Sequence, residues 1–233
     1  WTLWRQADVA REVIGCFHAL VRDPRFIHTC PCGRCKHGHV VAIRSDAQGF
    51  FPGVDVDAAC GVLVELVEHF ISLGFSGVLL SRSKDTTSKL TRMDKSPSFR
   101  YTYISLRSML DFGFASVRDV YFKLGHLVGQ RISGLPMGGS LSEPLAAIYS
   151  GWSIHRARHQ LDVWEVLGLR PPPGAPLSFD DMVQGKQHVD DVLAMSSVFC
   201  HFCLERIVSA MFPVSFGMDT EEISPTLRFL HVV

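Results

Sequence analysis

The sequence lacks long hydrophobic runs, a secretory leader and an excess of charge of either sign. No apolar run reaches the roughly 18 to 20 residues that a membrane-spanning helix requires. The N-terminus also lacks a basic segment followed by an apolar one, which is the pattern of a secretory signal. These absences predict a soluble, intracellular protein with no membrane partner.

The charges of the chain balance, because Lys and Arg total 23 and Asp and Glu also total 23. This balance argues against a nucleic-acid binder, since phosphate contacts are made by Lys and Arg. It conceals a basic loop at residues 81–100, where basic side chains are interleaved with Ser and Thr. Two interpretations of this loop stay open: it follows a phosphate backbone, or it is a solvated and mobile surface segment.

The chain has 233 residues, of which 47% are hydrophobic, so it can bury the core of one domain, with or without an additional lobe. It begins at Trp1 instead of Met and ends at Val233 inside a predicted strand. We therefore expect a segment of a longer protein, with lobes missing. No internal repeat is visible.

Hydrophobic periodicity and turn residues predict helices packed on an antiparallel sheet, the α+β class. Asp55 is a candidate N-cap for one helix, and Gly74 is a candidate stop. Asp190 and Asp191 lie between two short strand-like runs, as expected for the tip of a hairpin. The predicted strands are 40–43, 186–189, 192–195, 214–218 and 227–233, and the predicted helices are 54–73, 141–161 and 196–211.

Adjacent carboxylates at a hairpin tip are costly, because like charges repel and raise each other's pKa. A divalent cation relieves this repulsion, and two-metal phosphoryl transfer uses such carboxylates to hold ions about 4 Å apart. Asp46, between a predicted strand and a predicted helix, is the natural third carboxylate. The alternative that Asp46 only caps the turn before the helix stays open.

Around these aspartates the chain resembles the reverse transcriptases, over residues 40–233. Four segments resemble motifs of that family and follow its order. They are SDAQGFFP at 45–52 for the first palm motif, QRISGLPMGGSLS at 130–142 for the second, HVDD at 188–191 for the third, and LRFLHV at 227–232 for the primer grip. The Met137-Gly138 pair and the Phe-Leu-x-Val ending are most similar to the Penelope-like branch, a relative of telomerase.

The resemblance implies a right-hand polymerase palm at residues 40–233, partial fingers at residues 1–39 and an absent thumb. It implies that Asp46, Asp190 and Asp191 are catalytic and bind two Mg²⁺ ions together with the carbonyl of Ala47. The residues implied to contact the nucleotide and the template are Gln48, Gly49, Phe50, Phe51, Gly134, Pro136, Met137 and Gly138.

Phe51 matches the aromatic residue that lies under the incoming sugar and collides with a 2′-hydroxyl, which implies a preference for deoxynucleotides. Phe229 and Leu230 match residues that support the primer end. The alternatives, that Phe50 and Phe51 are ordinary core residues and that Gly138-Gly139 is only a tight turn, stay open.

Three departures from the family pattern stand out. His188 replaces the usual Tyr, His231 replaces the acid of Phe-Leu-Asp, and residues 218–222 contain no Lys to protonate the departing pyrophosphate. None of them removes a metal ligand.

Three of the seven cysteines lie with histidines between His28 and His39. Disulfides are not the default without a secretory signal, and Cys-x-Cys-x-x-Cys followed by His predicts a candidate structural zinc site. The alternative is a set of reduced thiols and exposed imidazoles. Cys200 and Cys203, one turn apart on a predicted helix, are interpreted as packing residues. The candidate zinc ligands are Cys30, Cys32, Cys35 and His37.

The resemblance thus predicts an RNA-directed DNA polymerase, a nucleotidyltransferase of a retroelement or of a telomerase-like protein, located in the nucleus. Its partners would be an RNA template, a DNA primer and deoxynucleoside triphosphates. One alternative is a catalytically inactive polymerase-like scaffold that binds RNA or protein in a larger assembly, and the retained aspartates argue against it. Another is an RNA-dependent RNA polymerase, against which Phe51 argues.

Overall fold

Two compact units make up the chain, which we describe from a computed structural model. The described residues are 6–21, 30–35, 40–83, 87–118, 120–136, 139, 141–174 and 178–223. The first unit combines residues 1–50 with 150–233, and the second comprises residues 51–149. Helix α4 (Ser142–Gln160) runs through the boundary between Tyr149 and Ser150. No helix in the described part is long and apolar enough to cross a membrane.

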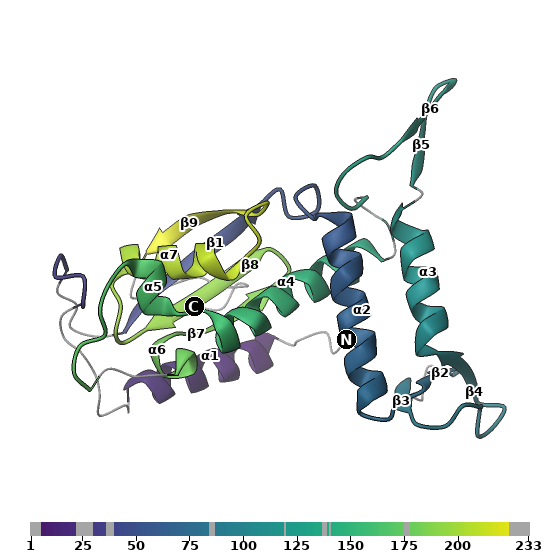
Figure 1. Ribbon diagram of the computed structural model, residues 1–233, viewed down its shortest axis with the longest axis horizontal. Coiled ribbons are helices and arrows are strands. Elements are labelled where there is room, and N and C mark those ends of the chain that lie inside the picture. The colour runs from purple at the N-terminus through teal and green to yellow at the C-terminus, as the bar shows by residue number, and fades with distance from the viewer. Residues whose placement is uncertain are drawn as a thin grey trace. The chain divides into compact units, whose positions relative to one another are not determined.

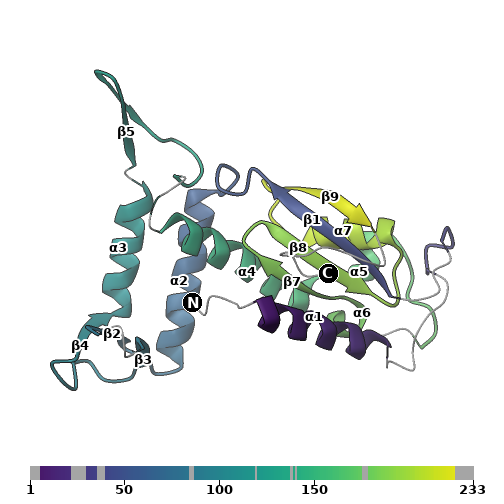
Figure 2. The same ribbon diagram turned by 180° about the vertical axis from the view of Figure 1, so that it is seen from behind.

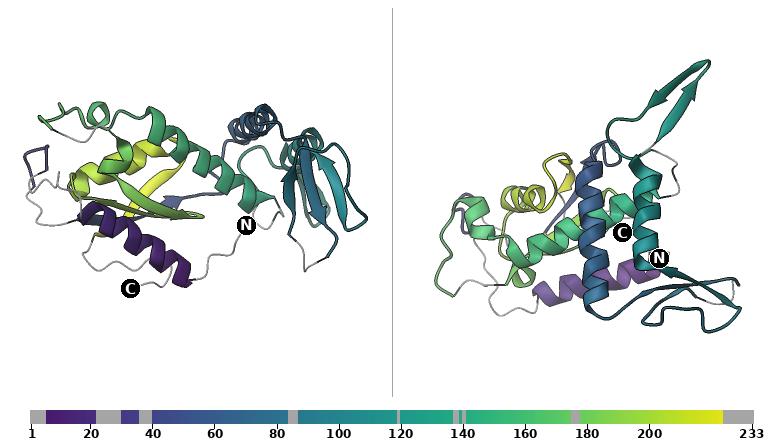
Figure 3. Two further views of the ribbon diagram at one scale, coloured as in Figure 1. Left: turned by 90° about the horizontal axis from the view of Figure 1, so that it is seen from below. Right: turned by 45° about the vertical axis from the view of Figure 1, so that its right-hand side comes forward.

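A four-stranded antiparallel sheet is the centre of the first unit, in the order β7-β8-β1-β9 (Figure 2). Helix α1 lies on one face of this sheet and helix α7 on the other, as the view from below shows (Figure 3). The elements of the unit, besides part of α4, are α1 (Gln6–Val21), β1 (Val41–Gln48), α5 (Val163–Leu167), α6 (Phe179–Met182), β7 (Gln184–His188), β8 (Asp191–Ser196), α7 (His201–Met211) and β9 (Gly217–Ile223).

Alternating burial along β1 distinguishes the two faces of this sheet. Ile43, Ser45 and Ala47 are 0%, 1% and 2% exposed and point away from α1. On the α1 side, Leu20 packs against Leu193 and Met195 of β8. Because successive strand residues point to opposite faces, Asp46 and Asp191 lie on the same side of the sheet as α1, farther along the strands.

The second unit places α2 and α3 side by side, with a small sheet at one end and a hairpin at the other (Figure 1). The Asp55 carboxylate accepts a hydrogen bond from the Ala58 N–H at 3.0 Å, which caps α2, and Gly74 follows the helix with φ of 84°. The elements of this unit are α2 (Val56–Ser72), β2 (Gly77–Ser81), β3 (Lys89–Thr91), β4 (Tyr101–Ser105), α3 (Leu106–Arg118), β5 (Tyr121–Leu124), β6 (Leu127–Gln130) and the first turns of α4. The strands form a three-stranded sheet, β3-β2-β4, and the β5-β6 hairpin.

The predicted combination of helices with an antiparallel sheet is confirmed, as are α2 with its cap, α4 and the β7–β8 hairpin. The predicted end of the first strand at residue 43 is wrong, because β1 continues to Gln48 and contains Asp46. The predicted start of the last helix at residue 196 is also wrong. Ser196 ends β8, and its hydroxyl donates to the Met182 carbonyl at 2.6 Å, so the helix begins only at His201. The predicted strand 227–233 lies outside the described residues.

Candidate active site and cysteine cluster

Asp46 lies near the end of β1, flanked by a strand on each side. β8 aligns Asp191 with it, and β9 aligns Asp219 with it. The Gln48 side-chain amide donates to the Asp46 carboxylate, with 3.0 Å between Nε2 and Oδ2. The strand pairing therefore fixes the backbone of Asp46, and Gln48 orients its side chain.

Asp190 and Asp191 lie at the tip of the β7–β8 hairpin. His188 pairs with Asp191, so Val189 and Asp190 form a two-residue turn. Val189 has φ of 54°, in the left-handed region that a β-branched residue rarely adopts. The Gln187 side-chain amide donates to the Val189 carbonyl at 2.7 Å. The turn therefore holds a strained residue directly before Asp190.

The three aspartates gather at one end of the sheet. Asp46 and Asp191 are opposite each other in the antiparallel register, a position in which Cβ atoms lie about 5 Å apart. The Ala47 N–H donates to the Asp190 carbonyl at 3.1 Å, which connects the hairpin turn to β1. The sequence predicted this grouping, and the structure brings it about through strand pairing.

Burial raises the pKa of the Asp46 carboxyl, and the negative charges of Asp190, Glu221 and Asp191 raise it further. Burial also raises the pKa of Asp191, while Arg44 lowers it and the neighbouring acids add to the rise. The Arg44 Nε atom lies 3.6 Å from Asp191 Oδ1, and the same guanidinium contacts the Glu221 carboxylate. The raised pKa values indicate that burial and the neighbouring carboxylates together outweigh the favourable charge of Arg44.

This donor set suits a hard divalent cation such as Mg²⁺, which prefers carboxylate and carbonyl oxygens. Within the described residues, four cysteines form a group close enough to hold a metal ion, and the three carboxylates do not form such a group. Mutual repulsion of like charges opposes a closer approach. Magnesium binding stays a prediction.

The second unit joins Phe51 to the second motif. The Leu135 N–H donates to the Phe51 carbonyl at 2.8 Å, and Leu135 is 0% exposed. Gly134 has φ of 67°, and a Cβ there would lie 2.6 Å from the Pro52 carbonyl oxygen and 2.8 Å from the Phe51 oxygen. Only glycine fits this position, because it has both the required φ and the required lack of a side chain. The structure thus brings the predicted Phe51 and Gly134 into one local contact.

Other residues predicted to contact nucleotide or template have mixed surroundings. Phe50 is 4% exposed, and its ring packs against Phe216 with 5.3 Å between the centroids, so its side chain is in the core. Gln48 and Gly49 are exposed. Pro136 is half-buried, and its carbonyl accepts from the Gly139 N–H at 3.1 Å.

Several predicted residues fall outside the described part of the chain. Among them are Met137 and Gly138 of the second motif and Phe229, Leu230 and His231 of the predicted primer grip. His37, a candidate zinc ligand, lies outside it as well.

The predicted zinc ligand set needs a correction. The structure groups Cys30 and Cys32 with Cys200 and Cys203, and all four sulfur atoms lie within 4.8 Å of one another. Cys35 is not part of this group, although its thiol interacts with Cys200 and Cys32. The interpretation of Cys200 and Cys203 as packing residues captured their burial and missed their partners. This cluster could bind a metal such as zinc.

Thiol pKa values differ within the cluster. Burial raises the pKa of Cys30 to about 11 and also raises that of Cys203. Burial raises the pKa of Cys32 too, but the Arg34 N–H and hydrogen bonds with neighbouring thiols lower it more, so that the result is about 7. Cys32 is therefore the thiol of this group that loses its proton most readily.

The basic loop is partly ordered by pairing. β3 within it pairs with β2, and the described residues from 87 to 100 are exposed except for Thr91. The Arg92 guanidinium lies over the Phe75 ring, 5.2 Å from its centroid. Lys84 is outside the described residues. The loop is thus accessible to a phosphate backbone, and such a contact stays a prediction.

Some residues of these sites were missed by sequence reasoning. Glu221 and the Arg44 side chain complete the charge balance at Asp191, and only the pairing of β9 with β1 makes their contact visible. The spacing Cys-x-x-Cys at 200–203 is itself a ligand signal and could have identified the second half of the cysteine cluster.

No protein-family model and no curated protein matches the chain. Solved telomerase structures share its fold. Telomerase from Candida albicans, in complex with a fragment of telomeric RNA, has a TM-score of 0.54 and 14% identity over 82% of this chain and 26% of that chain. Apo telomerase from Candida tropicalis truncated from its C-terminal domain has a TM-score of 0.51 and 13% identity over 88% of this chain and 31% of that one. The chain thus spans less than a third of the telomerase chains it matches.

Proposed function

Proceeding from this telomerase-like fold, we propose that the protein is a reverse transcriptase that adds deoxynucleotides to a primer 3′-hydroxyl on an RNA template. The observation that carries the proposal is the meeting of Asp46, Asp190 and Asp191 at one end of a sheet whose order β7-β8-β1 places the hairpin beside β1. The raised pKa values of Asp46 and Asp191 support it, because burial and the neighbouring carboxylates disfavour the charged forms of both groups, and a bound divalent cation would relieve that penalty.

In this proposal Asp46 and Asp190 would hold two Mg²⁺ ions, with the Ala47 carbonyl as a further oxygen ligand and Asp191 adding negative charge. Such ions, when bound, activate the attacking hydroxyl and neutralise the leaving pyrophosphate. Gln48 holds the Asp46 carboxylate through the hydrogen bond between their side chains. The Arg44 guanidinium contacts both Asp191 and Glu221 and in this way holds the Asp191 carboxylate in place. The chain's own contribution is thus to fix the carboxylates before substrate arrives.

Nucleotide selection is assigned to Phe51. The hydrogen bond from the Leu135 N–H and the close approach of Gly134 fix the backbone of Phe51, and therefore the position from which its side chain extends. We assign the exclusion of a 2′-hydroxyl to this ring, and contacts with the base pair and template to Pro136, Met137 and Gly138. The exposed backbone of Gln48 and Gly49 is assigned to the triphosphate.

The departures from the family pattern predict a slow enzyme. The described strand β9 presents Asp219 and Glu221 where a lysine would protonate the pyrophosphate. Loss of a general acid costs about 10² to 10⁴-fold in rate without abolishing the reaction. His188, paired with Asp191, takes the place of the usual tyrosine beside the primer.

The proposed organisation assigns residues 1–39 to partial fingers and residues 40–233 to the palm, with the basic loop 81–100 following the template backbone. A nuclear location and a Penelope-like or telomerase-like role belong to the same proposal. Telomerase structures with telomeric RNA support RNA as the template class, since the fold they share includes most of this chain.

The test is primer extension on an RNA template with Mg²⁺ and deoxynucleotides. Asp190→Asn is expected to reduce extension by about 10³-fold or more, because transition-state stabilisation by metal is worth several kcal/mol. Asp219→Asn is the matched control, since Asp219 also aligns with Asp46 but is assigned no metal, and it should retain extension. Primer-template binding without extension by the parent would refute the proposal and favour the inactive scaffold.

A further inference from the structure

The loop before β1 and the start of α7 bring four thiols together at the end of the sheet. Cys30 Sγ lies 3.6 Å from Cys203 Sγ, and Cys32 Sγ lies 3.8 Å from Cys200 Sγ. All four sulfur atoms are within 4.8 Å of one another. We propose that these four cysteines bind one Zn²⁺ ion in a closed structural site.

The sulfur spacing matches zinc better than disulfides. With Zn–S bonds of about 2.3 Å, the edges of a ZnS₄ tetrahedron are about 3.8 Å long. The measured distances of 3.6 and 3.8 Å lie at this value. A disulfide needs sulfur atoms about 2.05 Å apart. The pairs also run between two segments, with one Cys of the loop facing each Cys of α7, so a central ion can contact all four.

The loop from Cys30 to Cys35 is closed by its own backbone. The Cys30 N–H donates to the Cys35 carbonyl at 3.1 Å, and the Gly33 N–H donates to the Cys30 carbonyl at 2.9 Å, with Gly33 at φ of 70°. The Arg34 N–H points to Cys32 Sγ at 3.4 Å. Amide donors of this kind stabilise a thiolate. Half of the ligand set therefore lies on a short loop that is closed by its own backbone hydrogen bonds.

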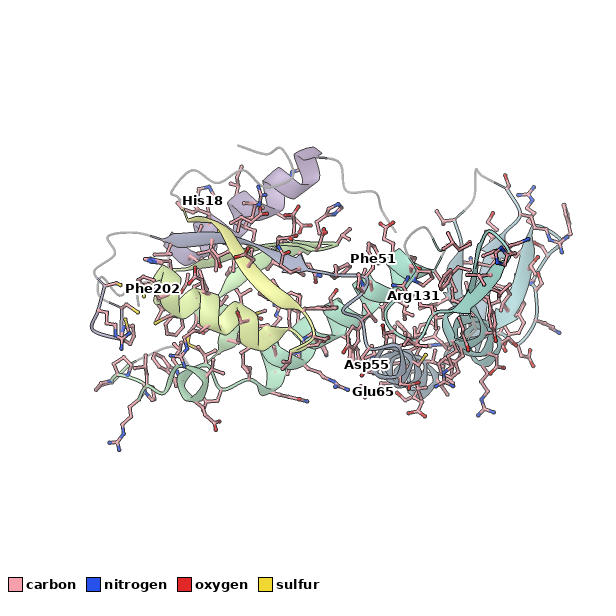
Figure 4. All side chains as sticks on the ribbon, turned by 90° about the horizontal axis from the view of Figure 1, so that it is seen from above. His18, Phe51, Asp55, Glu65, Arg131 and Phe202 are labelled. Atoms are coloured by element: carbon pink, nitrogen blue, oxygen red, sulfur yellow. The ribbon has the colours of Figure 1, made fainter. Side chains whose placement is uncertain are left out.

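Helix α7 supplies the other half. Cys200 is its N-cap residue and Cys203 lies in its first turn, where the partial positive charge of the helix favours thiolates. Cys30 and Cys200 are each 1% exposed and Cys203 is 6% exposed, so water has little access. Figure 4 shows sulfur atoms beside Phe202, at this end of α7. Cys32 is half-buried. Four thiolate ligands would fill all the tetrahedral positions, which is typical of structural zinc.

The site lies at the opposite end of β8 from the aspartates. Ser196, close before Cys200, pairs with Val41, whereas Asp191 pairs with Asp46. At about 3.3 Å per residue the strand separates the two ends by roughly 17 Å. Zinc there would take no part in phosphoryl transfer. It would attach the loop to α7 and fix where the chain enters β1, and this role holds whether or not the protein is a polymerase.

Metal analysis of the 233-residue chain, purified under reducing conditions, tests the proposal. We expect about one zinc per chain and, after exchange for Co²⁺, the visible and near-ultraviolet absorption of a tetrahedral tetrathiolate. Cys200→Ser and Cys203→Ser should each lose the metal. Cys35→Ser, which removes the neighbouring thiol outside the group, should keep it. Equal loss in Cys35→Ser and Cys200→Ser would overturn the ligand set.

If a serine variant fails to fold, Cys32→His provides the test instead. Histidine is also a zinc ligand, so this variant should still bind Co²⁺, with altered absorption. Hydrogen exchange adds a second readout: removal of zinc from the parent should speed exchange at Leu204, whose N–H donates to the Cys200 carbonyl at 2.9 Å, more than at Val62 within α2. Parent protein that is purified under reducing conditions, folds without zinc and takes up no Co²⁺ would refute the zinc site.

Discussion

Gly134→Ala is the substitution for which the second unit gives the sharpest expectation. Gly134 has φ of 67°, and an added Cβ would lie 2.6 Å from the Pro52 carbonyl oxygen and 2.7 Å from the Pro52 Cα atom. Both atoms are backbone, so the clash cannot be relieved by turning a side chain. Any movement that makes room also stretches the hydrogen bond between the Leu135 N–H and the Phe51 carbonyl.

The cost has two parts that a matched control separates. A non-glycine residue in the left-handed region costs about 1 to 2 kcal/mol, of which lower unfolded-state entropy returns about 0.4 to 1 kcal/mol. Gly125→Ala has only this backbone cost, because Gly125 has φ of 63° and nothing lies within 4 Å of its added Cβ. Gly134→Ala adds overpacking of about 1 to 3 kcal/mol. We expect net losses of about 0.5 to 1 kcal/mol at Gly125 and about 2 to 4 kcal/mol at Gly134.

Urea unfolding of the chain and both variants measures the difference, and thermal unfolding should show it as a further decrease in Tm of about 3 to 12 °C at this chain length. Primer extension should decrease in Gly134→Ala because Phe51 shifts with Pro52. Equal destabilisation by the two substitutions would refute the close approach of Gly134 to Pro52. If Gly134→Ala is less stable but selects nucleotides as the parent does, Gly134 is needed for packing and does not position Phe51 for nucleotide selection.

Three further predictions concern the aspartates, the hairpin and Phe51. Folding raises the pKa of Asp46 above its ordinary value of 3.8, so the protonated carboxyl stabilises the fold below that pH and this contribution is lost as the pH rises. Asp46→Asn should therefore be more stable than the parent near neutral pH in the presence of a chelator. Urea unfolding should show that this gain in stability vanishes in acid, and a gain that does not depend on pH would contradict the electrostatic cause. Val189→Gly should raise the free energy of unfolding by about 1 kcal/mol, because relief of about 1 to 3 kcal/mol of backbone strain exceeds the entropic cost of glycine, about 0.5 to 1 kcal/mol. Thermal unfolding measures this change, and a decrease in Tm would show that the Val189 φ of 54° is not strained. Phe51→Ala should increase relative incorporation of ribonucleotides about 10- to 100-fold in primer extension, and unchanged discrimination would remove Phe51 from nucleotide selection.

Local signals predicted the parts of the fold that local chemistry determines. Asp55 and Gly74 mark the ends of α2 because a cap and a left-handed glycine act within one turn of the chain. The hairpin with Asp190 at its tip follows from two short strand-like runs and the two-residue turn between them. The position of Asp46 after a predicted strand identified it as the third carboxylate, and the sheet places it opposite Asp191.

What the sequence did not reveal depends on partners far along the chain. The polar residues Arg44 and Asp46 hid the second half of β1, because their outward positions alternate with buried Ser45 and Ala47. Ser45 is buried since its hydroxyl meets Thr220 of β9 at 3.3 Å. Cysteine spacing is a ligand signal in both segments, but nothing local showed that Cys30 and Cys32 meet Cys200 and Cys203. Helix α1, predicted by no pattern we used, packs against the distant strands β7 and β8 and against Ala42 of β1.

The first unit is assembled from distant parts of the chain, with the whole second unit inserted between β1 and the strands that pair with it. In a nascent chain β1 can pair with its neighbours only after β8 and β9 have been synthesised. This sheet therefore forms late, through contacts between residues that are far apart in the sequence. The insertion itself is a different matter. Loop-closure entropy grows only with the logarithm of length, so doubling such an excursion costs about 0.6 kcal/mol. The length of the segment between Phe51 and Tyr149 is therefore free to vary among descendants of this gene while the sheet that holds the aspartates stays the same.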